Sequence, residues 1–132
     1  MMRESWLTAA PESAGIARAI VREAAVEQGL DRTATWDLML ATSEAVANAV
    51  LHGEACSEHG GIRLRVDGAD DGLWVEVCDC GRFRGCAVPA PENSTGGRGM
   101  VIMAAVTDGF ELVPNGSGTR VRFGKRQVAA AA

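Results

Sequence analysis

The feature that most constrains this chain is the stretch from Leu40 to Gly53, which has the periodicity of a helix and yet carries a row of polar side chains. Glu44, Asn48 and His52 follow one another at intervals of four residues. With 3.6 residues per turn, each interval rotates the side chain by only about 40°, so the three should project along one flank of the helix. An unpaired polar group buried beside a core costs about 1–3 kcal/mol. We therefore expect these side chains to have partners or a function.

The same helix should pack on the core through an apolar stripe. Asp31 or Thr33 is a suitable N-cap, and we expect the helix to run from there to about Leu51. Apolar residues at the i, i+3, i+4 and i+7 spacing are typical of a helix that covers a core. The predicted stripe comprises Trp36, Met39, Leu40, Ala47, Val50 and Leu51.

The composition indicates one globular domain. A chain of 132 residues, of which 47% are hydrophobic and 23% charged, is long enough to bury about two-thirds of its surface. We expect a single domain over residues 1–126 and a frayed tail over residues 127–132. The net charge of -4 comes without a basic stripe, which disfavours nucleic acid as a direct partner and suits a basic protein partner. No leader pattern and no apolar span of about 18 residues occur, which predicts a cytoplasmic protein without a membrane segment.

The four cysteines do not have the spacing of metal ligands. Cys78-x-Cys80, followed after five residues by Cys86, differs from the zinc-ribbon pattern. Cys78 and Cys80 also fall within a predicted strand. We therefore expect no metal on the cysteines, and free thiols as in other proteins of a reducing cytosol.

The chain before the polar helix predicts a strand and a covering helix. Ser5–Ala9 is a short strand candidate, and Pro11 suits the first turn of a helix that runs to about Gln28. Gly29 should end this helix. The stretch Gly53–Gly61 is rich in glycine and polar residues, which predicts a connecting loop.

A hairpin should follow this loop. Ile62–Val66 alternates between apolar and basic residues, and Asp70-Asp71-Gly72 can turn the chain back. Period-2 alternation then places Asp79 on the same buried face as the apolar residues. A carboxylate at such a position indicates a partner or a function. Gly81 removes a side chain where something must approach the backbone. The residues predicted to point inward are Ile62, Leu64, Val66, Leu73, Val75 and Val77.

A long aperiodic segment separates this hairpin from the last helix. Arg82–Thr95 exceeds most connections inside a compact domain, and such loops are often lids. It leads into Gly96–Gly99 and the apolar stretch Met100–Val106, which predicts a glycine-rich turn before a helix whose free N–H groups favour an anion. The dinucleotide fingerprint does not fit, because Ile102 stands where its third glycine should be.

The C-terminal part predicts a second hairpin. Its strands are expected around Phe110–Val113 and over Thr119–Phe123, joined by an Asn115-Gly116 turn. Thr119, Val121 and Phe123 should point inward. Thr119 therefore repeats the pattern of Asp79, a hydrogen-bonding group at the end of a buried face.

Together these elements predict a two-layer α/β sandwich, in which helices cover one face of a largely antiparallel sheet. Polar groups converge from the second helix and from two strands. They offer a carboxylate and a hydroxyl for a polar ring edge, an amide oxygen for a hard cation and glycine N–H groups for phosphate. A nucleotide bound with magnesium would use all of these groups.

Four motifs occur in order along the chain: Glu44-x3-Asn48-Ala49 with His52-Gly53, Asp79-x-Gly81, Gly97-Arg98-Gly99-Met100 and Gly118-Thr119. Together they resemble the boxes of the Bergerat-fold (GHKL) ATPases, and among these the short anti-sigma-factor serine/threonine kinases of bacteria. The resemblance covers nearly the whole chain.

The resemblance implies roles for these residues. Asn48 would ligate magnesium, Asp79 would bind the adenine amino group with Thr119 nearby, and Glu44 would be the general base. Gly97 and Gly99 would approach the phosphates, and Met100 replaces a more usual leucine. The implied nucleotide-binding residues are Asn48, Asp79, Gly81, Gly97, Arg98, Gly99, Met100 and Thr119.

The resemblance also implies a reaction and partners. ATP would donate its γ-phosphoryl group to a serine or threonine of an anti-sigma-factor antagonist, and the same surface region would hold a sigma factor. Glu44 and Asn48 favour this kinase over the alternative, an ATP-dependent module that sequesters a partner without phosphotransfer. A histidine kinase core is disfavoured, because neither His52 nor His59 lies in a separate dimerisation helix. Whether the chain forms a homodimer, as its relatives do, stays open.

Overall fold

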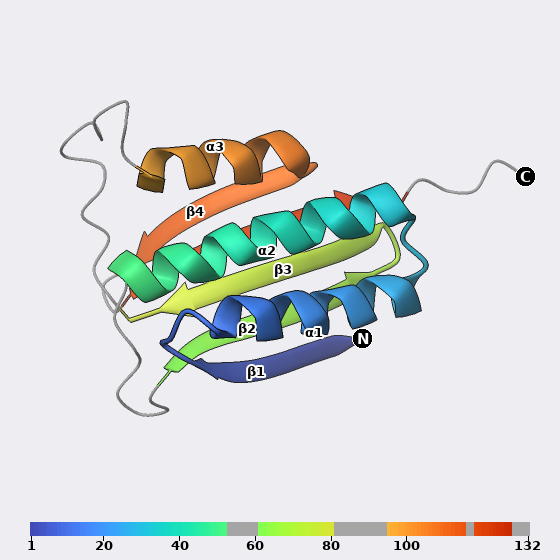
Figure 1. Cartoon of the computed structure of the whole chain (residues 1–132). Coiled ribbons are helices and arrows are strands. Elements are labelled where there is room, and N and C mark those ends of the chain that lie inside the picture. Colours follow the sequence, from blue (N-terminus) through green and yellow to red (C-terminus); the bar gives the residue numbers. More distant parts are fainter. Residues whose placement is uncertain (53–60, 81–94, 116–117, 128–132) are drawn as a thin grey trace, which may run out of the picture.

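The chain forms two layers, a five-stranded sheet and three helices on one of its faces (Figure 1), in the residues that the computed structural model describes, 1–52, 61–80, 95–115 and 118–127. The two-layer α/β sandwich predicted from the sequence is therefore confirmed. The elements are β1 (Met2–Thr8), α1 (Ser13–Gln28), α2 (Arg32–His52), β2 (Gly61–Ala69), β3 (Gly72–Asp79), α3 (Thr95–Val106), β4 (Gly109–Asn115) and β5 (Gly118–Arg126).

The strands pair in the order β1-β2-β3-β5-β4, and every pair is antiparallel. Two hairpins, β2–β3 and β5–β4, lie side by side in this order, with β1 as the edge strand beyond β2. Ala69 pairs with Gly72 where the first hairpin turns. The second hairpin is closed by the pair Asn115 and Gly118. Because β5 returns beside β3, the end of β3 lies opposite the beginning of β5. The pairing of β3 with β5 therefore decides which polar residues at these strand ends lie next to each other.

The core lies between the sheet and the helices, and the predicted alternation of the strands is confirmed. All six residues expected to point inward from β2 and β3 are buried, and Phe123 of β5 is buried with them. The helices contribute Val21, Leu38 and Met103, each with no exposed surface. The buried strand residues are Ile62, Leu64, Val66, Leu73, Val75, Val77 and Phe123.

The predicted apolar stripe of α2 is wrong in its largest members. Trp36, Leu40 and Leu51 are 57%, 42% and 70% exposed. The helix buries a face made mostly of small residues, which lets α2 lie close to the sheet and its neighbouring helices. Apolar residues occupy both sides of the helix, so their spacing alone cannot decide which side turns inward. The buried residues of α2 are Thr35, Leu38, Ala41, Thr42, Ala45, Val46 and Ala49.

The ends of the first two helices follow local chemistry. Asp31 is the cap of α2, since its Oδ1 accepts a hydrogen bond from the Ala34 N–H at 2.7 Å. Gly29 ends α1 as predicted, with the left-handed φ of 83° that favours glycine. The predicted start of α1 at Pro11 is two residues early, because Ser13 begins the helix and its hydroxyl donates to the Thr8 carbonyl at 2.5 Å.

Candidate functional site

The register of the sheet brings two of the predicted site residues together. Asp79, the last residue of β3, pairs directly with Thr119 of β5, and the preceding inward pair is Val77 with Val121. Thr119 is 8% exposed and Asp79 is half-buried. Both continue the buried face of the sheet at its end, as the alternation predicted. A carboxylate and a hydroxyl therefore lie side by side where the apolar core ends.

Gly118 explains why the two strands can approach so closely at this pair. A Cβ atom added to Gly118 would lie 2.0 Å from the backbone oxygen of Asp79 and 3.0 Å from the Cα atom of Cys80. These contacts involve backbone atoms, which a side-chain rotation cannot relieve. The glycine of the last motif therefore allows β5 to pair with β3 at Asp79 and Thr119, a reason that the motif alone did not reveal.

Glu44 and Asn48 lie on the flank of α2 that turns toward β5 and α3. Both are half-buried. Asp37 marks this flank, because its carboxylate contacts the Lys125 ammonium of β5 at 2.9 Å. Glu44 follows Asp37 by seven residues, close to two full turns, and Asn48 follows by eleven, close to three. Ser43 turns the other way and accepts a hydrogen bond from Arg18 of α1 at 2.8 Å.

The glycine-rich segment belongs to α3 itself, which corrects the predicted turn before a helix at Met100. The helix begins at Thr95, so Gly97 and Gly99 lie in its first turns. Glycine is unfavourable in a helix interior, but the first four N–H groups of any helix lack intrahelical partners. These groups stay available to an anion, as expected of the predicted turn. Met100 is half-buried and packs against the core.

These elements meet at one end of the molecule (Figure 1). The C-terminal end of α2, the tip of β3 and the start of α3 all lie on the left of this view. The structure thus gathers the Asp79–Thr119 pair, the Asn48 flank and the N-terminal turn of α3 at this end. Gly81, the Gly53–Gly61 loop up to residue 60 and the predicted lid up to residue 94 lie outside the described residues, as do the side chains of His52 and Arg98.

The cysteines correct one expectation. Cys78 is a free thiol, whereas Cys80 is disulfide-bonded, so the prediction of free thiols is wrong for Cys80. Burial raises the pKa of the Cys78 thiol. Among the described residues, no group of three or more His, Cys, Asp or Glu side chains is arranged to hold a metal ion.

The helices of the described residues include none that is long and apolar enough to span a membrane.

Comparison with known protein families identifies the family to which this domain belongs. Residues 7–125 match the histidine kinase-like ATPase domain. The chain belongs to that family. Membership implies that the domain binds ATP, and the resemblance to the Bergerat-fold ATPases is confirmed.

Within this family, the chain is similar to anti-sigma factors, both among curated proteins and among solved structures. Anti-sigma F factors from two Clostridium botulinum strains, Eklund 17B (Type B) and Alaska E43 (Type E3), are each 29% identical over 99 residues, covering 68% of this chain and 69% of the relative. The structure of the RsbU and RsbW domains of a Mycobacterium tuberculosis protein matches with a TM-score of 0.75 and 26% identity over 96% of this chain. This chain spans 32% of that longer one.

A more distant structure supports the fold alone. The histidine kinase domain of a blue-light-activated histidine kinase from Erythrobacter litoralis matches with a TM-score of 0.57 and 19% identity. The match covers 87% of this chain and 63% of that chain.

Proposed function

We propose that the domain binds ATP with magnesium at the end of the molecule where α2, β3, β5 and the start of α3 meet, and transfers the γ-phosphoryl group to a serine or threonine of a protein partner. The observation that carries this proposal is the direct pairing of Asp79 with Thr119 at the edge of the core. The ATPase family match supports it independently.

The Asp79–Thr119 pair has the chemistry of an adenine site. An ionised carboxylate only accepts hydrogen bonds, whereas a hydroxyl both donates and accepts. The amino edge of adenine offers a donor beside a ring-nitrogen acceptor, which matches this combination. The apolar residues Val77 and Val121 precede the pair on the same face and border the place where a planar ring would lie.

Asn48 is the proposed protein ligand of magnesium. Its amide oxygen is a hard donor on the half-buried flank of α2. Magnesium prefers oxygen ligands and usually keeps several waters, with one or two protein ligands and the phosphates completing its shell. When bound, the ion neutralises phosphate charge. One side-chain ligand therefore suffices for this role, and a cluster of carboxylates is not required.

Glu44 is the proposed general base. It lies one helical turn before Asn48, about 6 Å along the helix axis. If Asn48 holds magnesium near the phosphates, a carboxylate one turn away is placed to meet the incoming hydroxyl rather than the nucleotide. The hydroxyl oxygen forms the new bond to the γ-phosphorus, Glu44 takes the hydroxyl proton, and ADP leaves with the electrons of the broken bond.

The relatives suggest the partners. Proteins named anti-sigma F factor and a structure with an RsbW domain resemble this chain. We therefore propose that the phosphoryl acceptor is an anti-sigma-factor antagonist and that the domain sequesters a sigma factor.

A pair of carboxylate variants tests the proposal. Glu44→Gln keeps the shape but removes the base, so ATP affinity should persist while phosphotransfer to the antagonist falls by about 10²–10⁴. Asp37→Asn is the matched control, because Asp37 occupies the same flank two turns earlier. It should retain phosphotransfer. A wild-type rate in Glu44→Gln removes Glu44 as the base, and nucleotide-dependent partner binding without any phosphotransfer by the wild type replaces the kinase with a binding module.

A further inference from the structure

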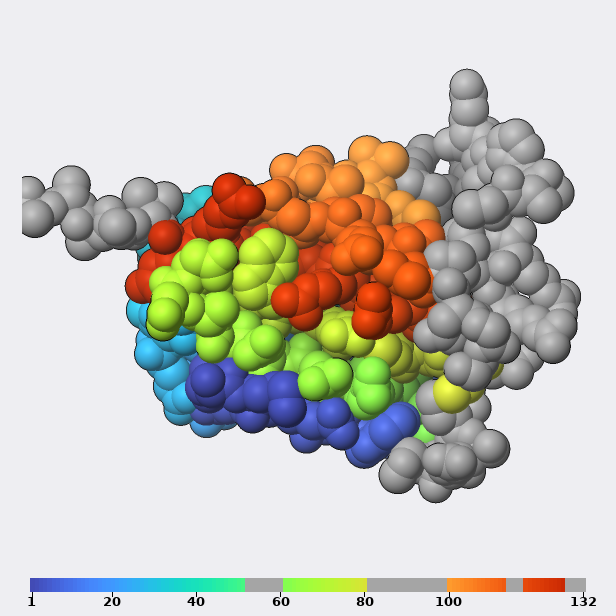
Figure 2. All heavy atoms as spheres, turned by 180° about the vertical axis from the view of Figure 1, so that it is seen from behind, coloured from blue at the N-terminus to red at the C-terminus, as the bar shows by residue number. Residues whose placement is uncertain are grey.

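Figure 2 looks onto the second face of the sheet, which none of the described helices covers. Arginines of β2 and β5 lie on this face. The whole chain is acidic, with 17 Asp and Glu against 13 Lys and Arg. The alternation that buries Ile62, Leu64 and Val66 turns the intervening residues of β2 outward, and the same holds for β5. We call this surface the arginine face. It comprises Arg63, Arg65, Arg120 and Arg122, which surround Glu76 of β3.

Glu76 is a buried carboxylate that does not balance the charges around it. Its side chain is 8% exposed, and the guanidinium nitrogens of Arg63, Arg120 and Arg122 lie 3.6, 3.8 and 3.9 Å from its oxygens. One negative charge among three positive charges leaves a surplus of two positive charges. These distances are longer than hydrogen bonds. Glu76 instead accepts a hydrogen bond from the Cys78 thiol at 3.3 Å.

The same arginines have unused donors. The Nε atoms of Arg63 and Arg120 are buried and have no hydrogen-bond partner. The side chains of Arg63, Arg120 and Arg122 nevertheless remain 31%, 42% and 36% exposed. Their charged ends can therefore meet a further acceptor from outside. A buried donor without a partner is unfavourable, so an incoming acceptor that draws these side chains into new hydrogen bonds would relieve that cost.

A small hollow lies beside this cluster. Its volume is about 90 Å³. The Arg122 guanidinium lies 5.4 Å from the centre of the Trp74 ring. The ring itself lies against Gly109 and Gly124, where an added Cβ atom would come within 2.9 and 2.1 Å of it. The hollow is lined by Met2, Arg65, Asp67, Trp74, Glu76 and Arg122.

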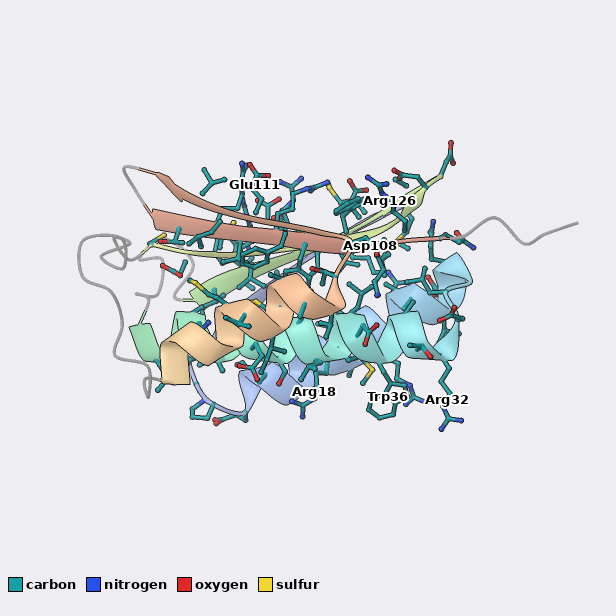
Figure 3. All side chains as sticks on the ribbon, turned by 90° about the horizontal axis from the view of Figure 1, so that it is seen from above. Arg18, Arg32, Trp36, Asp108, Glu111 and Arg126 are labelled. Atoms are coloured by element: carbon teal, nitrogen blue, oxygen red, sulfur yellow. The ribbon has the colours of Figure 1, made fainter. Side chains whose placement is uncertain are left out.

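We propose that the arginine face docks an acidic segment of a protein partner, whose carboxylates approach the exposed ends of Arg63, Arg120 and Arg122 around Glu76. The face lies on the side of the sheet opposite the helices and is therefore separate from the proposed ATP site. Glu4 and Asp67 of the same face, together with Glu111, which points away from the helices in Figure 3, repel a continuous polyanion. Separate carboxylates can be placed between these charges, so an acidic peptide fits better than a nucleic acid or an anionic membrane.

Side-chain NMR of the full chain with a synthetic peptide in which glutamates alternate with glycines tests the proposal. The peptide should shift the Nε–H signals of Arg120 and Arg122 and the indole signal of Trp74, but not the indole signal of Trp36, which points away from the sheet in Figure 3. Arg120→Gln and Arg122→Gln should each weaken binding about three- to ten-fold. Arg22→Gln, the matched control on the exposed surface of α1, should leave affinity unchanged.

A further variant tests the surplus of charge. Glu76→Gln removes the carboxylate that competes with the peptide, so affinity should rise by about the same factor. Thermal unfolding checks that this variant is folded, and the exposed arginine variants test the docking without it.

Four results would overturn the proposal. The first is unchanged affinity in both arginine variants. The second is an equal response to inorganic phosphate, which indicates an ion site only. The third is stronger binding of a single-stranded oligonucleotide or of anionic vesicles. The fourth is a wild-type dimer that Arg122→Glu dissociates, which shows that a second copy of the chain covers this face.

Discussion

Gly118→Ala tests how the sheet positions the candidate site. The added Cβ atom would lie 2.0 Å from the Asp79 backbone oxygen, whereas ordinary van der Waals contact begins at 3.4 Å, so the alanine is 1.4 Å too close. The strands must separate at this point, because neither the alanine Cβ atom nor the Asp79 backbone oxygen can move away by a side-chain rotation. Overpacking of this kind costs about 1–3 kcal/mol. For a domain of this size the melting temperature should fall by roughly 3–12 °C.

The same displacement should weaken ATP binding. Movement of Asp79 by about 1 Å breaks a hydrogen bond to a charged acceptor, which is worth about 1.5–3 kcal/mol, or about 10–100-fold in affinity. Calorimetry with ATP and magnesium measures this loss. The titration should be done well below the melting temperature, where the variant is fully folded. The loss of ATP affinity then reflects the displaced Asp79 and not unfolded protein.

Gly15→Ala is the matched control. An added Cβ atom at Gly15 would meet only the flexible end of Arg18, at 3.5 Å. Alanine in place of a helical glycine stabilises by about 0.4–1 kcal/mol where the backbone permits it. This variant should therefore melt slightly higher and bind ATP normally. A Gly118→Ala protein with the wild-type melting temperature and ATP affinity would refute the reasoning about the strand contact.

Three further predictions concern stability. Asp31→Ala removes the cap that accepts the Ala34 N–H and should lower the unfolding free energy by about 1 kcal/mol in urea titrations, most of which Asp31→Asn should retain. Burial raises the pKa of the Cys78 thiol in the folded state, so the stabilisation should be complete below the unfolded value of about 8.5 and fall as pH rises through the folded value; an identical decline in Cys78→Ala would contradict this. Gly124→Ala would place a Cβ atom 2.1 Å from the Trp74 ring and should cost about 1–3 kcal/mol with a change in tryptophan fluorescence, unless Trp74→Ala is present to remove the clash.

The strands could be predicted from the sequence because their alternation has one interpretation. Val75 and Val77 are inward and their neighbours are not, so the same period placed Asp79 at the end of the buried face. The alternation could not show that Asp79 meets Thr119, since this depends on β5 pairing with β3 after α3 and β4 have intervened. Only the family resemblance implied that Thr119 lies near the group that Asp79 binds.

The helices were harder to predict for physical reasons. Leu38 and Leu40 point to nearly opposite sides of α2, and only packing against the sheet decides that Leu38 is buried. The start of α3 was misplaced because glycine has low helix propensity, a weak preference that tertiary context overrides. Glu76 was missed entirely. Its burial depends on arginines from β2 and β5, which become its neighbours only in the folded sheet.

The most direct test of the central claim is calorimetric titration of ATP with magnesium into the wild type and Asp79→Asn, with Asp67→Asn on the opposite face of the sheet as the control. The amide can present a donor where adenine needs an acceptor, so Asp79→Asn should weaken binding by about 10–100-fold while Asp67→Asn binds normally. Unchanged ATP affinity in a folded Asp79→Asn protein would contradict the proposed site.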